Sequence, residues 1–233
     1  MGGVLQRPVQ EQEGRGPKAV VSRSERLKKL KGICQNCRQC SLCTSRTNLV
    51  FGDGTSEAWL LCIGEAPGAE EDKTGIPFIG RSGQLLRKML TAIGLSKDKD
   101  YYIANILKDR PPGNRVPESE EIDSCIKFLK KQIEIISPSV ILLLGRTAVR
   151  GLLPDFANHP VDKMRALSKD LVTVTYQNIP VVVTYHPSAL LRDPSKKINA
   201  VSDFRFVEGI ARNREHCNKV LLWTPEESLH SFM

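Results

Sequence analysis

The sequence has no apolar run of the length that a membrane span requires. A spanning helix needs about 20 consecutive, mostly apolar residues, and no run among these 233 residues approaches that length. The N-terminus also lacks the apolar core of a secretory signal, and neither a Walker pattern nor a GxGxxG motif follows the first predicted strand. We therefore expect a cytoplasmic protein, at work on the nucleoid or in an organelle, with no membrane partner.

Basic residues outnumber acidic residues by 34 to 26, which gives a formal net charge of +8 and a pI near 9.2. This balance attracts polyanions such as nucleic acid, although charge alone fits a merely soluble basic protein equally well. The length and the apolar fraction of 40% suit one domain with a real core. We expect a flexible tail over residues 1–22, a single domain over 23–215 and an extension of unknown role over 216–233.

Four of the seven cysteines lie within ten residues, in the run CQNCRQCSLC. A thiol therefore stands at every third position: Cys34, Cys37, Cys40 and Cys43. One helical turn or a tight loop would gather several of these sulfurs on one side, as a tetrahedral metal or an iron–sulfur cluster requires. A disulfide frame of the secreted kind fits this spacing less well. Spacing does not separate zinc from iron–sulfur, and buried or spare thiols are the alternative.

Short apolar runs alternate with amphipathic helical patterns along the rest of the chain. The runs predict strands over residues 58–63, 101–107, 140–144, 171–176 and 181–185. The patterns predict helices over 24–33, 82–95, 118–136, 146–153 and 203–214, the second with Ser82 as its N-cap and Gly94 as its terminator. This alternation predicts an α/β fold in which a parallel sheet carries helices on both faces.

The stretch from Leu60 to Gly83 has the composition of a strand that leads into a ligand-binding loop. Its glycines allow positive φ or a close backbone approach, and its two prolines restrict the backbone. Ligands of open α/β sheets bind beyond the carboxyl ends of the strands. This glycine-rich loop, Asn105 and His186 all follow predicted strands, so we expect them to meet at one edge of the sheet.

Five motifs follow one another through the middle of the chain, over roughly residues 37–193. They are GEAPG with the following Glu71-Asp72, PFIGRSGQLL, ANILK, RPPGNRVP and TYHPSALLR. Together they resemble the family 4 uracil-DNA glycosylases, the iron–sulfur branch of the uracil-DNA glycosylase superfamily. The resemblance implies a three-layer α/β/α fold with a central, mainly parallel four-stranded sheet. It also implies a monomeric DNA repair enzyme that flips uracil out of single- or double-stranded DNA and hydrolyses its N-glycosidic bond.

The resemblance implies a role for each site residue. His186 would stabilise charge on the departing uracil, and Glu65 would steady the sugar cation or orient water. Phe78 would stack on the base and Asn105 would pair with its polar edge. The rest of the base pocket would come from the glycine-rich loop: Gly64, Ala66, Gly68, Glu71 and Asp72. DNA would be held by a basic set with two backbone contacts: Arg110, Arg115, Pro187, Ser188 and Arg192. The alternatives are a core phenylalanine, a structural asparagine and a solvated acidic loop.

The resemblance further implies a structural 4Fe-4S cluster, and here the sequence departs from the family. In register, the ligands would be Cys37, Cys40, Asp109 and Cys125, so a carboxylate stands where the family has a thiolate. Either Asp109 binds iron through oxygen, or Cys34 or Cys43 takes its place, or the cluster is labile or incomplete.

A second function class is an iron–sulfur protein of the same fold that binds nucleic acid with weak or no glycosylase activity. The intact Glu65, Asn105 and His186 argue against it, whereas Asp109 argues for it. A zinc protein with a nucleotide cofactor is disfavoured because no cofactor-binding glycine motif follows the first strand.

Overall fold

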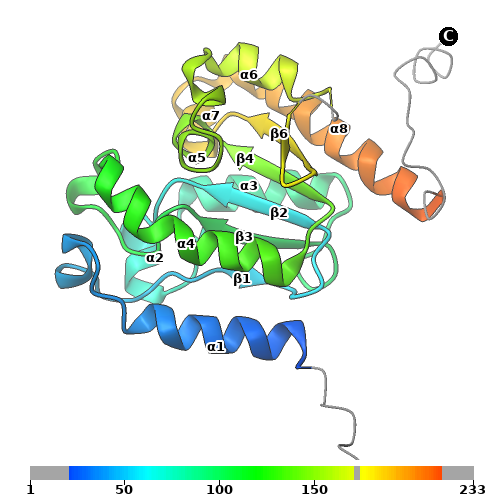
Figure 1. The fold of residues 1–233 in the computed structure, drawn as a ribbon. Helices are drawn as coiled ribbons and strands as arrows, with labels where there is room; N and C mark the ends of the chain where they lie inside the picture. Colours follow the sequence, from blue (N-terminus) through cyan, green and yellow to red (C-terminus); the bar gives the residue numbers. More distant parts are fainter. Residues whose placement is uncertain (1–20, 171–173, 217–233) are drawn as a thin grey trace, which may run out of the picture.

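The computed structural model of the chain describes residues 21–170 and 174–216 (Figure 1). The expected N-terminal tail, apart from Val21 and Ser22, lies outside this range. So does the expected C-terminal extension, apart from residue 216, and part of the strand expected over 171–176.

A mixed six-stranded sheet forms the middle layer, in the strand order β1-β3-β2-β4-β6-β5. The four central strands are parallel: β3 (Tyr101–Asn105), β2 (Leu60–Gly64), β4 (Val140–Leu144) and β6 (Ile179–Thr184). Two short antiparallel strands form the edges: β1 (Asp53–Gly54) and β5 (Thr175–Tyr176). Every residue of β2, β3 and β4 is buried, as expected of strands covered on both faces. The predicted mainly parallel four-stranded centre is confirmed.

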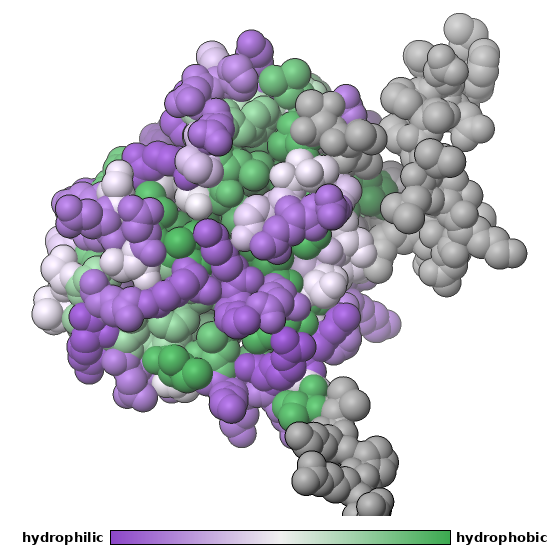
Figure 2. Space-filling model, viewed as in Figure 1, coloured by the Kyte–Doolittle hydropathy of each residue, from purple (hydrophilic) through white to green (hydrophobic). Residues whose placement is uncertain are grey.

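Helices cover both faces of the sheet. On one face pack α1 (Arg23–Gln35), α4 (Ser119–Ile136), α5 (Arg146–Leu152) and α6 (Val161–Leu167), over a core that includes Leu61 and Ile63 of β2. On the other pack α3 (Arg81–Ala92) and α8 (Lys197–His216), over Leu60 and Cys62. The alternation along β2 follows from the two-residue period of a strand. Among the described helices none is long and apolar enough to cross a membrane, and Figure 2 shows mostly hydrophilic side chains on the face that α1 and α4 cover.

Short elements complete the chain. They are α2 (Ala69–Thr74), α7 (Pro187–Arg192) and the 3₁₀ turns η1 (Ser41–Thr44), η2 (Pro112–Asn114), η3 (Phe156–Asn158) and η4 (Pro194–Lys196). The helix α2 lies inside the stretch expected to be a loop, and it ends at Gly75, whose φ is +75°. The prediction of Ser82 as an N-cap is wrong: α3 begins at Arg81 after Gly80, so Ser82 is already within its first turn.

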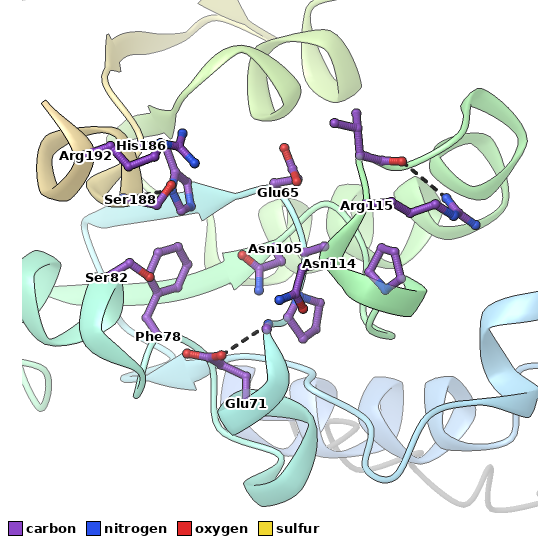
Figure 3. A pocket seen from close by; sticks show the side chains of 15 residues that line it. Glu65, Glu71, Phe78, Ser82, Asn105, Asn114, Arg115, His186, Ser188 and Arg192 are labelled. Carbon is purple, nitrogen blue, oxygen red and sulfur yellow. Dashed lines mark hydrogen bonds between the residues drawn. The ribbon is translucent and has the colours of Figure 1, made fainter.

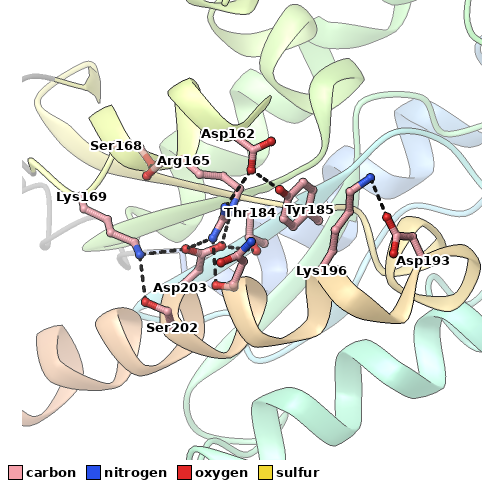
Figure 4. Close-up of polar contacts among 11 residues, drawn as sticks. Asp162, Arg165, Ser168, Lys169, Thr184, Tyr185, Asp193, Lys196, Ser202 and Asp203 are labelled. Carbon is pink, nitrogen blue, oxygen red and sulfur yellow. Dashed lines mark hydrogen bonds and ion pairs between the residues drawn. The ribbon is translucent and has the colours of Figure 1, made fainter. Parts of the chain in front are cut away.

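A buried ion pair fastens α6 and α8 to the end of β6 (Figure 4). The Arg165 guanidinium donates to both oxygens of Asp203, at 2.7 and 2.9 Å, and the Thr184 hydroxyl donates to the same carboxylate at 2.8 Å. Asp203 is fully buried. Because Thr184 ends β6, this network fixes the point from which the chain continues to His186.

Candidate active site

A pocket of about 480 Å³ opens where β2, β3 and β6 end (Figure 3). Its walls come from the segments after these strands, from the start of α3 and from the loop around η2: Glu65, Ala66, Pro67, Gly68, Glu71, Phe78, Ser82, Asn105, Pro111, Asn114, Arg115, Val116, His186, Ser188 and Arg192. The predicted meeting of the glycine-rich loop, Asn105 and His186 at one sheet edge is confirmed.

Phe78 forms a wall of the pocket, and its backbone is held by contacts with α3. Its φ is +54°, which is unusual for a bulky residue. Arg87 donates to the carbonyl oxygens of Phe78 and Pro77, at 3.2 and 3.1 Å. At Gly83 an added Cβ would lie 2.0 Å from the Phe78 backbone, so only glycine allows this contact. The ring therefore has a fixed direction, with its centroid 5.8 Å from that of the His186 ring.

Asn105, the last residue of β3, brings a buried polar side chain to the pocket. It is 1% exposed, and its Oδ1 has no hydrogen-bond partner within the described part of the chain. A Cβ at Gly64 would lie 2.5 Å from this oxygen, so the glycine of the neighbouring strand makes the space that the amide occupies. A buried acceptor without a donor costs about 1–3 kcal/mol. The oxygen is thus prepared to accept a hydrogen bond from a ligand.

His186 presents a neutral imidazole to the pocket. Burial, followed by the nearby charge of Arg192, lowers the pKa of His186 to about 4. Its Nδ1 accepts from the Ser188 backbone N–H at 3.2 Å, and the Ser188 hydroxyl lies 2.8 Å from the same atom. These contacts assign the ring proton to Nε2. The ring therefore offers one N–H donor, and it does so without carrying a charge near pH 7.

The carboxylates of the glycine-rich loop have different surroundings. Glu65 lines the pocket. Glu71 also borders it, but its oxygens accept from the backbone N–H groups of Gly68, Ile79 and Gly80, at 3.2, 3.0 and 2.9 Å. Glu71 thus ties the two loops that flank the pocket to each other.

Asp72 lies away from the pocket. It is buried and accepts from the backbone N–H groups of Thr47 and Asn48, at 2.9 and 3.4 Å. The structure therefore places this carboxylate against the segment that follows the cysteines, and not among the residues that line the pocket.

Of the residues predicted to contact DNA, Arg115, Ser188 and Arg192 line the pocket. Arg115 forms a two-pronged pair with Glu121, at 2.9 and 2.6 Å. Arg110 donates to Asn114 at 2.8 Å and does not line the pocket, and Pro187 is buried in the first turn of α7.

Sequence reasoning missed five pocket residues, which are Pro67, Ser82, Pro111, Asn114 and Val116. The last three belong to the RPPGNRVP motif, where Asn114 adopts a φ of +56° and Val116 is 61% exposed. The signal available in the sequence was a valine between an arginine and a proline within this motif, whereas its exposure is visible only in the fold.

A second, small cavity gathers four thiols, those of Cys34, Cys37, Cys40 and Cys125. Asp109 and Lys108 line it as well, whereas Cys43 does not. Burial raises the pKa of the Cys34 thiol to about 12 and that of Cys125 to about 11. Across residues 21–170 and 174–216, no three Cys, His, Asp or Glu side chains converge closely enough to bind a single metal ion.

This donor set fits an iron–sulfur cluster. Such clusters are held by cysteine thiolates spread around several metal atoms, whereas a structural zinc ion requires four ligands within about 2.3 Å of one point. Within the described residues four thiols line one cavity and no three ligands converge on a single point, which suits the wider group.

Lys108 connects the two cavities. It is 1% exposed, its ammonium donates to the Asn105 carbonyl and to Gln132 at 2.8 and 2.7 Å, and its backbone N–H donates to the Cys125 sulfur at 3.3 Å. Burial lowers the pKa of Lys108 to about 8.

Comparison with known proteins agrees with this geometry. A family model described as the uracil DNA glycosylase superfamily matches residues 51–207. The type-4 uracil-DNA glycosylase of Thermotoga maritima is 42% identical over 157 residues, which cover 67% of this chain and 79% of the relative. That of Archaeoglobus fulgidus is 40% identical over 162 residues (69% and 81%), and that of Sulfurisphaera tokodaii is 37% identical over 188 residues (79% and 84%).

Proposed function

The chain belongs to the uracil DNA glycosylase superfamily, and from this membership we propose that it removes uracil from DNA. The enzyme flips the nucleotide out of the strand into the pocket at the sheet edge. It hydrolyses the N-glycosidic bond and leaves an abasic site for base excision repair.

The observation that carries this proposal is the unpartnered Oδ1 of Asn105. Uracil has an N–H between two carbonyl groups on its pairing edge. Asn105 accepts from that N–H through Oδ1 and donates to a neighbouring carbonyl through Nδ2. Cytosine has no proton on the same nitrogen, and its amino group would face the Nδ2 donor. A cytosine in this pocket would leave Oδ1 unpaired, at a cost of about 1–3 kcal/mol.

Two further groups shape the base pocket. Phe78 supplies the stacking face, because its ring is fixed in direction by the contacts around it. Glu71 holds the loops on either side of Phe78, and the resulting wall excludes the methyl group of thymine. Gly64, Ala66 and Gly68 provide the close backbone approach that this narrow space needs.

The chemistry follows from where charge develops. As the bond between C1′ and the base breaks, the sugar becomes an oxocarbenium-like cation and the uracil becomes an anion. The carboxylate of Glu65 stabilises the cation and orients the attacking water. The Nε2–H of His186 donates to a uracil oxygen as negative charge builds up there. The low pKa of His186 keeps the ring neutral near pH 7, so its contribution to the leaving group is a hydrogen bond from a neutral imidazole.

DNA is held by charge and by backbone contacts around the pocket. Arg115, Arg192 and the backbone of Ser188 bind phosphates beside the flipped nucleotide, and Arg110 and Pro187 support this rim. The net charge of +8 adds a salt-dependent attraction for either single- or double-stranded substrate. We further propose that the protein acts as a monomer.

A 4Fe-4S cluster at the second cavity belongs to the same proposal. Cys37, Cys40 and Cys125 supply three of its thiolates. When bound, the cluster supplies a structural cross-link and takes no part in the hydrolysis. The three cysteines bring the segment after α1 against α4, which carries Cys125.

The test is release of uracil from a labelled oligonucleotide, read as strand cleavage after alkali, with cytosine and thymine strands as substrate controls. We expect release from the uracil strand only. Asn105→Ala and His186→Ala should each reduce the single-turnover rate by about 10²–10³-fold, whereas His159→Ala, at a histidine outside the pocket, should leave it unchanged. A folded protein that binds the oligonucleotide but releases no uracil would instead be the binding protein of the second function class.

A further inference from the structure

We propose that Cys34, rather than Asp109, supplies the fourth thiolate of the iron–sulfur cluster. The inference rests on the proposed function in one respect, because it requires the chain to hold a cluster. It concerns a position at which this chain differs from its family, since Asp109 stands where the resemblance places a cysteine.

Cys34 is already at the cavity. It lies in the last turn of α1, is 1% exposed and lines the same space as the three proposed ligands Cys37, Cys40 and Cys125. Its carbonyl oxygen accepts from the Cys37 N–H at 3.0 Å, so a tight turn carries the chain from one thiol to the next. Cys43 has the same spacing in the sequence, but it lies in η1 and does not line this cavity.

Asp109 has another partner. Both of its carboxylate oxygens lie 3.2 Å from Nη1 of Arg46, and the pair is almost fully buried. If Asp109 turned towards iron, the Arg46 charge would lose its partner inside the protein, and breaking such a pair costs about 3–5 kcal/mol. Thiolate is also the ligand type that iron–sulfur clusters prefer over carboxylate.

The same pair holds Cys34 in place. Nη2 of Arg46 donates to the carbonyl oxygen of Gln35, the residue after Cys34, at 2.5 Å. The Asp109 carboxylate therefore acts through Arg46 on the end of α1. This chain has a carboxylate at position 109 where the family has a thiol, and the thiol of Cys34 compensates for that loss. The cluster therefore keeps four thiolates.

The spacing supports this assignment. Cys34, Cys37 and Cys40 form a C-x₂-C-x₂-C run, with Cys125 supplied from a distant helix. Three thiolates from such a run and a fourth from elsewhere in the chain is how bacterial ferredoxins hold each 4Fe-4S cluster.

The experiment measures iron and sulfide per chain, and absorbance near 400 nm, in the anaerobically purified full chain and its variants. We expect Cys34→Ser to lose at least half of its iron and absorbance. Cys43→Ser is the matched control from the same run, and it should keep both. Asp109→Asn should also keep its iron. The double variant Cys34→Ser/Asp109→Cys should regain iron, because it restores a thiolate at the position that the family uses.

Several results would overturn the assignment. A folded Cys34→Ser protein with the iron content and spectrum of the unmodified chain does so. Iron loss in a folded Asp109→Asn protein also does so if Arg46→Gln, which breaks the same ion pair, keeps its iron. If Cys34→Ser does not fold, the double variant decides: regained iron supports the proposal, and a folded double variant without iron overturns it. Uracil release is assayed in parallel, so that an iron-free but active chain refutes the inference alone, whereas an iron-loaded but inactive chain refutes the proposed activity alone.

Discussion

Replacing Gly64 by alanine tests the base pocket with a single methyl group. The added Cβ would lie 2.5 Å from Asn105 Oδ1 and 2.5 Å from Phe78 Cζ. Ordinary contacts between such atoms are about 3.5 Å long, so at least one neighbour must move by about 1 Å. Phe78 cannot retreat easily, because its backbone rests against Gly83. The methyl group therefore shifts the amide, the ring or both.

The two expected effects differ in size. Overpacking of this kind costs about 1–3 kcal/mol of stability, which lowers the melting temperature by roughly 2–12 °C in a chain of this length. Displacing a positioning group by about 1 Å costs roughly 10²-fold in rate. We therefore expect Gly64→Ala to stay folded at 25 °C and to excise uracil about 10²-fold more slowly.

The assay is single-turnover excision with enzyme in excess, accompanied by thermal unfolding of each protein. The matched control is Gly209→Ala in α8, where a Cβ would meet nothing within 4 Å. This variant should keep its excision rate, and its free energy of unfolding should rise by about 0.5–1 kcal/mol. A folded Gly64→Ala protein with an unchanged rate and unchanged uracil affinity would refute the assignment of Phe78 and Asn105 as the walls around the base.

Three further predictions follow from other contacts. Burial lowers the pKa of His186 from 6.5 to about 4. Between about pH 6.5 and pH 4 the unfolded chain therefore binds a proton at this histidine, whereas the folded chain does not. The stability that this group contributes is complete above about pH 6.5 and is lost as the pH falls. Between pH 7 and pH 5, urea unfolding should show a loss about 2 kcal/mol larger in the unmodified chain than in His186→Asn. Asp203→Ala removes the buried carboxylate partner of Arg165 and leaves that guanidinium with only the exposed Asp162 as an ion-pair partner, so it should cost about 3–5 kcal/mol in urea unfolding. Asp193→Ala, in an exposed pair, should change the stability far less. Arg192→Ala should reduce the slope of log affinity for DNA against log salt by about 1, whereas Arg205→Ala on α8 should leave this slope unchanged. If the two variants give equal slopes, Arg192 does not contact DNA.

The sequence predicts a strand well where a short, unbroken apolar run is bounded by turn residues. The strand over 140–144 is an unbroken apolar run between Ser139 and Gly145, and its predicted bounds agree with β4. The strand predicted over 101–107 ends earlier, at Asn105. The N–H groups of Ile106 and Leu107 still donate to Gly64 and Glu65, but the chain has already left the ladder.

The helix α2 shows why the glycine-rich loop was harder to predict. The glycines that indicate a loop also mark where this short helix begins and ends, since Gly68 precedes it and Gly75 closes it with a positive φ. A six-residue helix has too few apolar positions to show a period. The directions of Glu71 and Asp72 depend on which backbone N–H groups lie nearby, and only the folded chain determines that.

The partners of the site residues follow the same rule. Asp109 pairs with Arg46, which lies 63 positions away in the sequence, and no local sequence pattern predicts the pair. The convergence of Asn105 and His186 was predictable, because strand order and the common direction of parallel strands place them at one edge. Which oxygen would remain without a donor was not.

The fully buried Lys108 has a consequence for protein engineering. The Lys108 ammonium donates to the carbonyl oxygen of Asn105, and the Lys108 backbone N–H donates to the Cys125 sulfur in the thiol cavity. A designer who wished to transplant the pocket onto a metal-free scaffold could not remove the cysteine segment as a separable module. The replacement would have to supply a new donor for the Asn105 carbonyl and new support for the strand end, within a volume that this one lysine now fills.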